Sequence, residues 1–319
     1  MRVKKFVISN TILSIILITA LYGLSWIYIN YVNDRTVKFI EYNKLLDNSV
    51  NVVSLGSSHG KFGIKLDKKN QMSLSLESQR FYYDFKMLEK YEKKIKEGAI
   101  IIIPLSVFSF YENEEFFNGE TYKNYINLLR KNDIRKKLKN SEYFLIRNFS
   151  VLYPPARLIE TLKYLLKEGL KKNYIYYSKN LRGEELRKEA IETAKGHSTG
   201  LKEEYKKNGI NSLNNILNYS HKRRYRAIFV VTPYWYGYTD ELERIEKNIF
   251  ENKIYKNLKK IEKLQKREYI FLDYSHDKRF INNEEFFMDD DHLNEKGAEY
   301  FTEILLKDIE KELKNEREI

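Results

Sequence analysis

The chain has 319 residues, of which 42% are hydrophobic, with 13 glycines and 4 prolines. This composition can bury a substantial core, and it excludes an intrinsically disordered or collagen-like chain. The absence of cysteine excludes disulfides, cysteine-ligated zinc or iron–sulfur centres and thiol nucleophiles. The formal charge of +12 favours an anionic partner.

The N-terminal segment predicts a membrane anchor. Basic residues among positions 1–5 precede an uncharged run, and its apolar part, residues 6–29, exceeds the roughly 20 residues that span a bilayer core. Trp26 and Tyr28 stand where interfacial aromatic residues lie. Since no signal-peptide cleavage site is evident, we expect a single-pass anchor with a cytoplasmic tail, a juxtamembrane linker over residues 30–48 and an extracytoplasmic domain beyond it.

Short, unbroken apolar runs predict the strands of a parallel sheet. They cover residues 51–55, 99–103, 227–231 and 269–272, and helical patterns cover residues 82–96, 239–266 and 294–314. Alternation of strands and helices predicts an α/β domain over residues 49–319, a three-layer α/β/α sandwich.

The middle of the chain predicts a helical insertion at about residues 112–226. Its helical patterns cover residues 121–138, 155–170, 184–194 and 213–223. Between Thr121 and Arg226 lie 25 basic and 10 acidic residues. This regional excess favours an anionic polymer or surface as a partner, unless the base composition of the gene accounts for all of it.

The first predicted strand runs into Gly56-Ser57-Ser58-His59-Gly60. Ligands of open parallel sheets bind beyond the carboxyl ends of strands, so a serine in this turn lies where chemistry would occur. The backbone N–H groups of such a turn can face a developing oxyanion. An ordinary strand exit has the same composition.

A second polar motif, Asp289-Asp290-Asp291-His292, precedes the last predicted helix. Asp289 stands three residues before His292, so one turn can place its carboxylate behind the imidazole and leave the other ring nitrogen facing a serine. Three alternatives remain open: a metal site built from the three aspartates and His292, a helix cap by Asp291 or Asn294, and a structural surface pair of Asp289 and His292.

Together the two motifs resemble the SGNH (GDSL-type) serine esterase superfamily. The resemblance implies a flavodoxin-like fold, Ser58 as nucleophile, His292 as general base and then acid, Asp289 as its orienting partner, and no cofactor or metal. In that family a glycine and a Gly-x-Asn asparagine complete the oxyanion hole with the N–H of the nucleophile. Neither is found where expected: Ser75 or Ser78 is the nearest candidate to replace the glycine, and Ser106 to replace the asparagine.

The anchor, the Gly-Ser-Ser turn, the stretch from Ser78 to Asp84 and Val231-Thr232-Pro233 resemble a narrower branch. It comprises membrane-anchored proteins similar to the D-alanyl-lipoteichoic acid transfer protein, the DltD-like branch. This resemblance implies transfer or removal of acetyl or alanyl groups on a cell-envelope polysaccharide or teichoic-acid-like polymer, with a membrane-bound O-acyltransferase as a possible partner.

Other residues are weaker candidates. His59 is expected to form a pocket wall, and Tyr234 and Trp235 either a sugar-stacking rim or internal packing. His197 is expected on an exposed loop. Two rival functions remain: a catalytically silent scaffold for an anionic polymer or an acyltransferase, and a metal-dependent phosphoester hydrolase. Nucleic-acid binding is not expected outside the cytoplasm.

Overall fold

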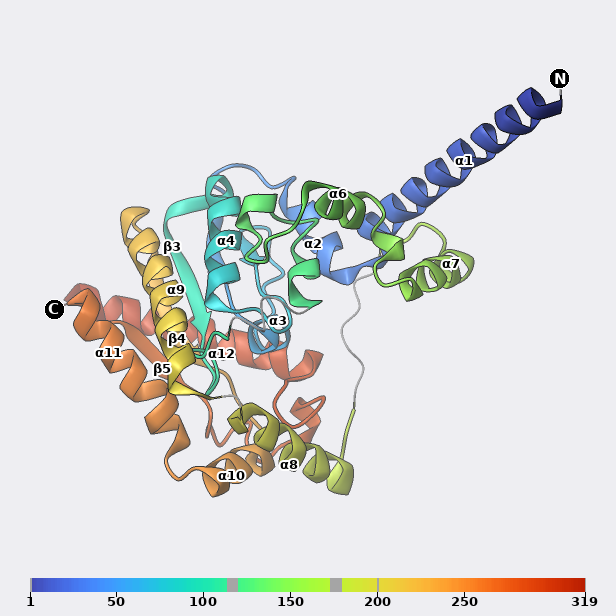
Figure 1. Ribbon diagram of the computed structural model, residues 1–319. Coiled ribbons are helices and arrows are strands. Elements are labelled where there is room, and N and C mark those ends of the chain that lie inside the picture. The colour runs from blue at the N-terminus through green and yellow to red at the C-terminus, as the bar shows by residue number, and fades with distance from the viewer. Residues whose placement is uncertain (1, 114–119, 173–179, 200, 319) are drawn as a thin grey trace. The chain divides into compact units, whose positions relative to one another are not determined.

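The computed structural model describes residues 2–113, 120–172, 180–199 and 201–318. These form two compact units (Figure 1). The anchor unit falls within Met1–Lys44 and Glu115–Ile175, and the sheet unit within Leu45–Glu114 and Tyr176–Ile319. The segment predicted as one helical insertion therefore divides between the two units.

The sheet unit contains a five-stranded parallel sheet in the order β2-β1-β3-β4-β5. The strands are β1 (Val50–Ser54), β2 (Gln71–Ser73), β3 (Ile95–Pro104), β4 (Arg226–Val231) and β5 (Ile270–Asp273). This is the strand order of flavodoxin-like sheets, whose ligands bind where the order reverses, beside β1 and β3. The four predicted strands and the α/β class are confirmed. Strand β2 was not predicted because its three residues, Gln-Met-Ser, carry no apolar run.

Seven α-helices of the sheet unit are described. They are α3 (Ser58–Gly63), α4 (Phe81–Tyr91), α8 (Gly183–Thr199), α9 (Glu203–Lys222), α10 (Tyr236–Ile245), α11 (Lys256–Gln265) and α12 (Glu295–Glu318). The single helix predicted over residues 239–266 is wrong, because Asn248 adopts a positive φ of 58° and interrupts it. The helix predicted over residues 82–96 ends early, because β3 begins at Ile95.

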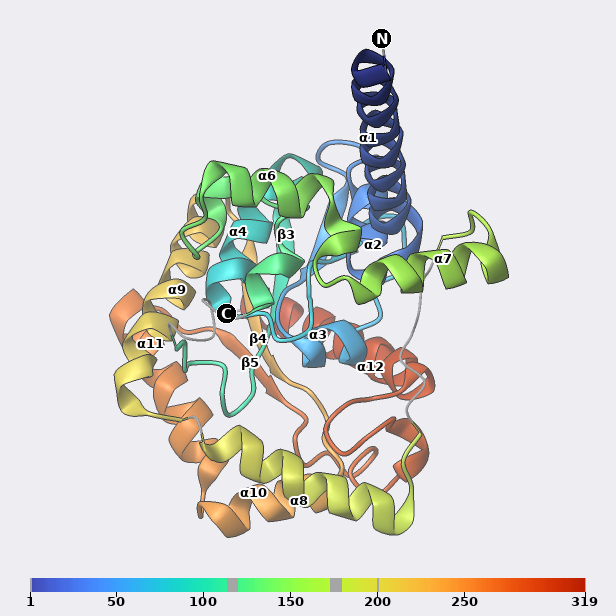
Figure 2. The same cartoon turned by 45° about the vertical axis from the view of Figure 1, so that its right-hand side comes forward.

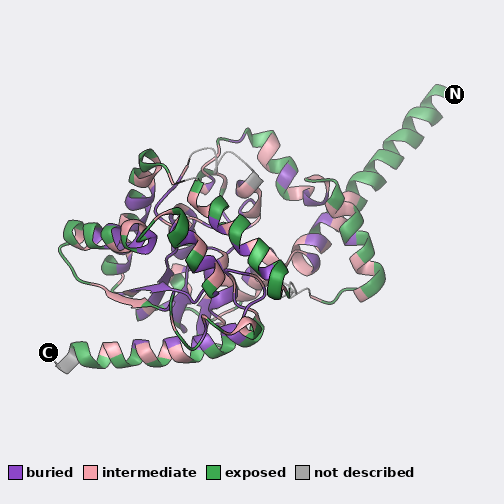
Figure 3. Ribbon diagram, turned by 90° about the horizontal axis from the view of Figure 1, so that it is seen from below, coloured by how far each residue is buried: buried purple, intermediate pink, exposed green. Residues whose placement is uncertain are grey.

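The core of the sheet unit lies around its central strands. All the side chains of β4 from Ile228 to Val231 are fully buried, and so are those of β3 from Ile101 to Ile103 (Figure 3). Because both faces of these strands are buried, their sequences are unbroken apolar runs.

The anchor unit begins with α1 (Arg2–Ile27), which continues as a π-helical turn over Tyr28–Val32. The stretch Val3–Val32 is long and apolar enough to cross a membrane, and most of its side chains are exposed (Figure 3). Helix α2 (Asp34–Tyr42) occupies part of the predicted linker.

Two further α-helices of the anchor unit are α6 (Asn140–Asn148) and α7 (Ala156–Glu168). The helix predicted over residues 121–138 is wrong: this segment contains two short 3-10 turns, Glu120–Asn124 and Lys131–Asp133. Asn132 and Asp133 favour turns because their side chains compete for backbone hydrogen bonds.

Candidate functional site

The serine turn follows β1 and enters α3. Gly56 has a φ of +106°, a conformation that favours glycine, and Ser58 is the first residue of α3 and half-buried. A Cβ at Gly60 would lie 2.5 Å from the carbonyl oxygen of Leu55. The two glycines that bracket the serines are therefore required by the backbone.

Asp84 holds this turn from α4. Its Oδ1 accepts hydrogen bonds from the Gly56 N–H and from the Gln79 side-chain amide, each at 2.6 Å. Burial raises the pKa of Asp84 to about 7, although both hydrogen bonds oppose the rise. The stretch from Ser78 to Asp84, noted in the sequence, thus supports the turn that carries Ser58.

The predicted Asp289 and His292 pair is in contact. Asp289 Oδ1 accepts a hydrogen bond from the backbone N–H of His292 at 2.8 Å and lies 3.0 Å from its Nδ1. The loop closes through a hydrogen bond from the Met288 N–H to the His292 carbonyl. Asn294 caps α12 by accepting from the Gly297 N–H at 3.0 Å. Of the two predicted caps, the structure has Asn294.

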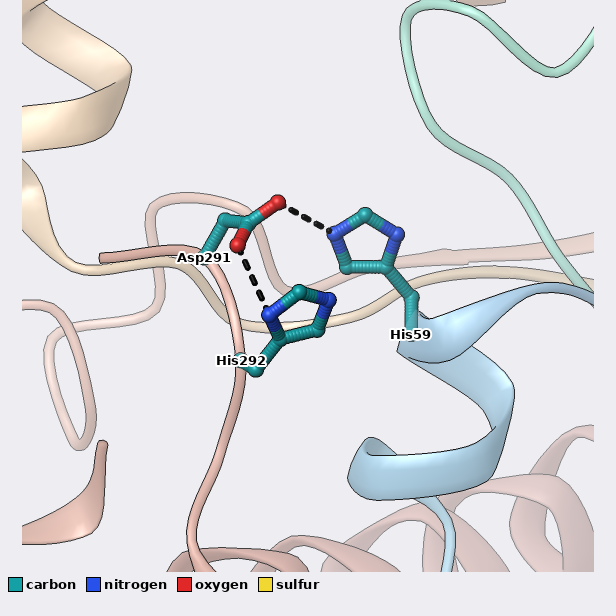
Figure 4. Close-up of side chains that lie close together, drawn as sticks. All are labelled: His59, Asp291 and His292. Carbon is teal, nitrogen blue, oxygen red and sulfur yellow. Dashed lines mark hydrogen bonds and ion pairs between the residues drawn. The ribbon is translucent and has the colours of Figure 1, made fainter. Parts of the chain in front are cut away.

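Asp291 joins two imidazoles instead of capping the helix (Figure 4). Its Oδ1 lies 2.9 Å from His292 Nδ1, and its Oδ2 lies 3.2 Å from His59 Nε2. The rings of His59 and His292 stack with their centroids 5.0 Å apart. His59 is therefore buried in a charged network, a role that sequence reasoning missed because 232 positions separate it from Asp291.

The two carboxylates control the protonation of His292. Burial alone would lower the pKa of His292, but the charge of Asp291 and hydrogen bonds to Asp289 and Asp291 hold it well above 6.5. Burial would raise the pKa of Asp291, but His292 and His59 hold it well below its usual value. At neutral pH Asp291 and His292 therefore form an ion pair, and His292 must lose a proton before it can act as a base.

The remaining ring nitrogen of His292 is uncommitted. Its Nε2 is buried and has no hydrogen-bond partner within the described residues. Phe62 packs its ring edge against His292, with centroids 5.5 Å apart. Ser58 stands four residues before Phe62, at the start of the same helix. No hydrogen bond between Ser58 and His292 is formed among the described side chains.

A pocket of about 180 Å³ opens beside Ser58. It is lined by Ser57, Ser58, Ser78, Arg80, Phe108, Tyr111, Gly196, His197 and Leu201. His197 comes from α8, so its predicted position on a loop is wrong. Its Nδ1 lies 2.8 Å from the Tyr238 hydroxyl and 3.7 Å from Asp291 Oδ2. Burial lowers the pKa of His197 to about 4, so this imidazole is neutral at neutral pH.

The oxyanion candidates lie in different surroundings. Ser78 adopts a φ of 58° and lines the pocket together with Ser58. Ser106 is buried; its N–H donates to Ser109 Oγ at 2.8 Å, and its hydroxyl lies 3.4 Å from His59 Nδ1. The backbone donor of Ser106 is thus already engaged.

Tyr234 and Trp235 pack inside the protein. They are 1% and 2% exposed, so their rings offer no face for a sugar in this structure. The Tyr234 ring meets His59 edge-on, with centroids 5.3 Å apart. The backbone N–H of Trp235 donates a hydrogen bond to the backbone carbonyl of Asp290. This bond joins the segment that follows β4 to the histidine loop. The structure therefore agrees with the predicted internal packing and not with a sugar-stacking rim.

Among the residues that the structure describes, two groups of side chains could hold a metal ion. The ligand atoms of His59, Asp291 and His292 lie within 4.8 Å of one another, as do those of Asp289, Asp290 and Asp291. The contacts with Asp291 engage His59 Nε2 and His292 Nδ1, so a metal that used these two nitrogens would have to displace them, whereas His292 Nε2 has no partner among the described residues.

Comparison with known proteins gives no family assignment. No protein-family model matches the chain, and no curated protein matches it significantly.

Proposed function

We propose that the protein is a membrane-anchored serine esterase or O-acyltransferase of the SGNH type. The observation that carries this proposal is the histidine loop: Asp289 holds His292 through Nδ1, and Nε2 has no hydrogen-bond partner among the described residues. Phe62 of α3, the helix that begins at Ser58, packs against the same ring. An oriented imidazole with one free nitrogen suits the role of general base for a serine nucleophile.

In the proposed reaction, neutral His292 takes the Ser58 hydroxyl proton at Nε2 while Ser58 Oγ attacks the carbonyl carbon of an ester. The tetrahedral oxyanion collapses, His292 returns the proton to the departing alkoxide, and an acyl-serine remains. Water or a second hydroxyl then attacks the acyl-serine, again with His292 accepting and returning the proton. Asp289 keeps the imidazole in place throughout.

The proposed setting is the cell envelope. Helix α1 is long and apolar enough to anchor the chain, and the basic residues before it favour a cytoplasmic N-terminus. The basic excess between Thr121 and Arg226 suits an anionic polymer such as a teichoic acid or an acylated polysaccharide. A three-layer sandwich of the SGNH type and cooperation with a membrane-bound O-acyltransferase belong to the same proposal.

Covalent labelling of the full chain in detergent tests this function. A fluorophosphonate probe at pH 8 should form an adduct on Ser58, mapped by mass spectrometry. The adduct should vanish in Ser58→Ala and fall by about 100-fold or more in His292→Ala, the usual range for loss of a general base. Ser57→Ala is the matched control, because it removes the neighbouring hydroxyl and should leave the adduct on Ser58. Absence of any adduct in folded protein, or equal labelling of His292→Ala, would refute the proposal.

A second candidate is a catalytically silent scaffold that binds an anionic polymer. It is favoured by two observations: no hydrogen bond joins Ser58 to His292 in the part of the chain that the structure describes, and the pKa of His292 lies well above 6.5. If Ser58→Ala retains the cellular phenotype while reversal of exposed lysines between Thr121 and Arg226 abolishes it, the scaffold is correct.

A further inference from the structure

Helix α7 of the anchor unit has an apolar surface that the protein does not cover. One side of α7 packs: Leu158 and Tyr164 contact the small core formed by Tyr28, Val32 and Val151. Next to that side, Ile159, Leu162 and Leu166 are 58%, 44% and 89% exposed. Exposed apolar side chains in a contiguous group mark a surface for a partner or a membrane.

The three exposed side chains form one strip along α7. Their spacing of three and four residues places them on the same side of the helix. Lys163 and Lys167 are exposed and border the strip, and Glu160 is exposed further round the helix. An apolar strip bordered by lysines is typical of helices that lie in the plane of a membrane interface.

The position of α7 along α1 agrees with that interpretation. A bilayer core takes about 20 residues of helix, so a span that starts after Lys5 leaves the hydrocarbon near Ser25. Trp26 is half exposed there and suits the interfacial level. The structured segment before α7 meets α1 at this level, since the Val151 N–H donates to Ser25 Oγ at 3.4 Å.

Helix α7 itself contacts the π-helical turn that follows α1. The guanidinium of Arg157 lies over the Tyr28 ring, 5.3 Å from its centroid. Figure 2 shows α7 running crosswise to α1, near the C-terminal end of α1. A helix crosswise to the span at this level lies along a membrane surface.

We propose that α7 is an interfacial helix that buries Ile159, Leu162 and Leu166 at the boundary between lipid headgroups and acyl chains. Lys163 and Lys167 then face anionic headgroups. This inference rests on the proposed membrane insertion of α1 and does not depend on the acyl-transfer chemistry. It assigns α7 a lipid partner and fixes the anchor unit on the bilayer through two helices.

Depth-dependent quenching tests the inference. Because the chain has no cysteine, Leu166→Cys, Glu160→Cys and Ile12→Cys each carry one nitrobenzoxadiazole label. The full chain is reconstituted into vesicles of phosphatidylcholine and phosphatidylglycerol, and the label is quenched by lipids brominated near the headgroup or by aqueous iodide. All three positions have exposed side chains, so the substitutions spare the core.

We expect bromolipid to quench the Leu166→Cys label at least about two-fold more than the Glu160→Cys label, and iodide to show the reverse order. The Ile12→Cys label reports on α1: if bromolipid placed deep in the acyl region does not quench it, the anchoring proposal fails. If the Ile12→Cys label is quenched and the Leu166→Cys label is open to iodide, the α7 inference alone is overturned. Protection of the Leu166→Cys label from both quenchers would also overturn it, because a protein would then cover the strip.

Discussion

The serine turn and the histidine loop are both held by a buried aspartate, but the pKa values of the two carboxyl groups shift in opposite directions. Asp84 accepts hydrogen bonds from two neutral donors, the Gly56 N–H and the Gln79 amide, and its pKa rises to about 7. Asp291 lies between His59 and His292, and its pKa falls well below its usual value.

Burial is similar at the two positions, so the partner decides the charge. Neutral dipoles offset only part of the cost of burying a carboxylate, whereas a protonated imidazole offsets it fully. The two halves of the proposed site therefore respond differently to pH. Alkaline pH ionises Asp84 behind the serine turn and neutralises His292 in the histidine loop.

Asp291→Ala should give the largest loss of stability. It leaves two buried imidazoles without their shared acceptor, and breaking a buried ion pair costs about 3–5 kcal/mol. The raised pKa of His292 adds stability that is fully present below pH 6.5 and is lost as the pH rises through the folded-state pKa. Denaturant unfolding of the detergent-solubilised chain at pH 6 should show the full loss.

Asp291→Asn is the matched control for shape. It keeps one acceptor oxygen but no charge. Its free energy of unfolding should therefore lie between those of the wild type and Asp291→Ala. Equal stability of all three proteins would mean that the charge of Asp291 does not hold the loop.

Asp84→Ala should cost about 2–3 kcal/mol, because it leaves the buried Gly56 N–H and Gln79 amide without their acceptor. Asp84→Asn keeps an acceptor oxygen and should cost less. Since the folded-state pKa of Asp84 is raised from 3.8 to about 7, its contribution to stability falls as the pH rises from about 4 to about 7. Unfolding of the Asn variant should lack that slope; an unchanged slope would assign it to other groups.

The sequence predicts the sheet well because buried parallel strands have an unbroken apolar signature. Ala227 to Val231 and Ala99 to Ile103 were found for this reason, whereas β2 is too short to show it. Asn248 was not recognised as a break because an asparagine within a helical pattern is a weaker signal than a proline or glycine, although asparagine adopts the left-handed conformation more readily than most residues.

The site was predictable only where its residues are close in the chain. Asp289 and His292 share one turn, so their spacing predicts their contact. His59 and His197 reach the same carboxylate, Asp291, through the fold. The one signal available was scarcity: the chain has five histidines, and three of them meet at one aspartate.

Asp289→Asn should change the pH dependence of Ser58 labelling and leave the fold largely unchanged. Hydrogen bonds and the charge of Asp289 raise the pKa of His292, so their loss should move the rising limb of the labelling rate toward lower pH. A move of about one pH unit corresponds to about 1.4 kcal/mol. The rate of fluorophosphonate labelling of Ser58 from pH 5 to pH 10 measures this. The maximal rate should also fall, because the imidazole is held less firmly; a limb that stays in place would exclude His292 as the titrating base.

Asp290→Asn should have the smallest effect on the free energy of unfolding at neutral pH. At high pH the substitution should stabilise the protein. Burial and the charges of Asp291 and Asp289 raise the pKa of Asp290 to about 8, so the wild-type side chain is a neutral acid at pH 7. Asparagine has nearly the same shape and can keep the hydrogen bond from Thr193 Oγ1, so the free energy of unfolding at pH 6–7 should change by less than about 1 kcal/mol.

Above pH 8 the wild type must ionise a buried group next to Asp291, and the variant should then be the more stable protein. Three consecutive aspartates would thus have three different roles, because each faces a different partner: Asp289 orients His292, Asp290 stays protonated, and Asp291 carries the charge.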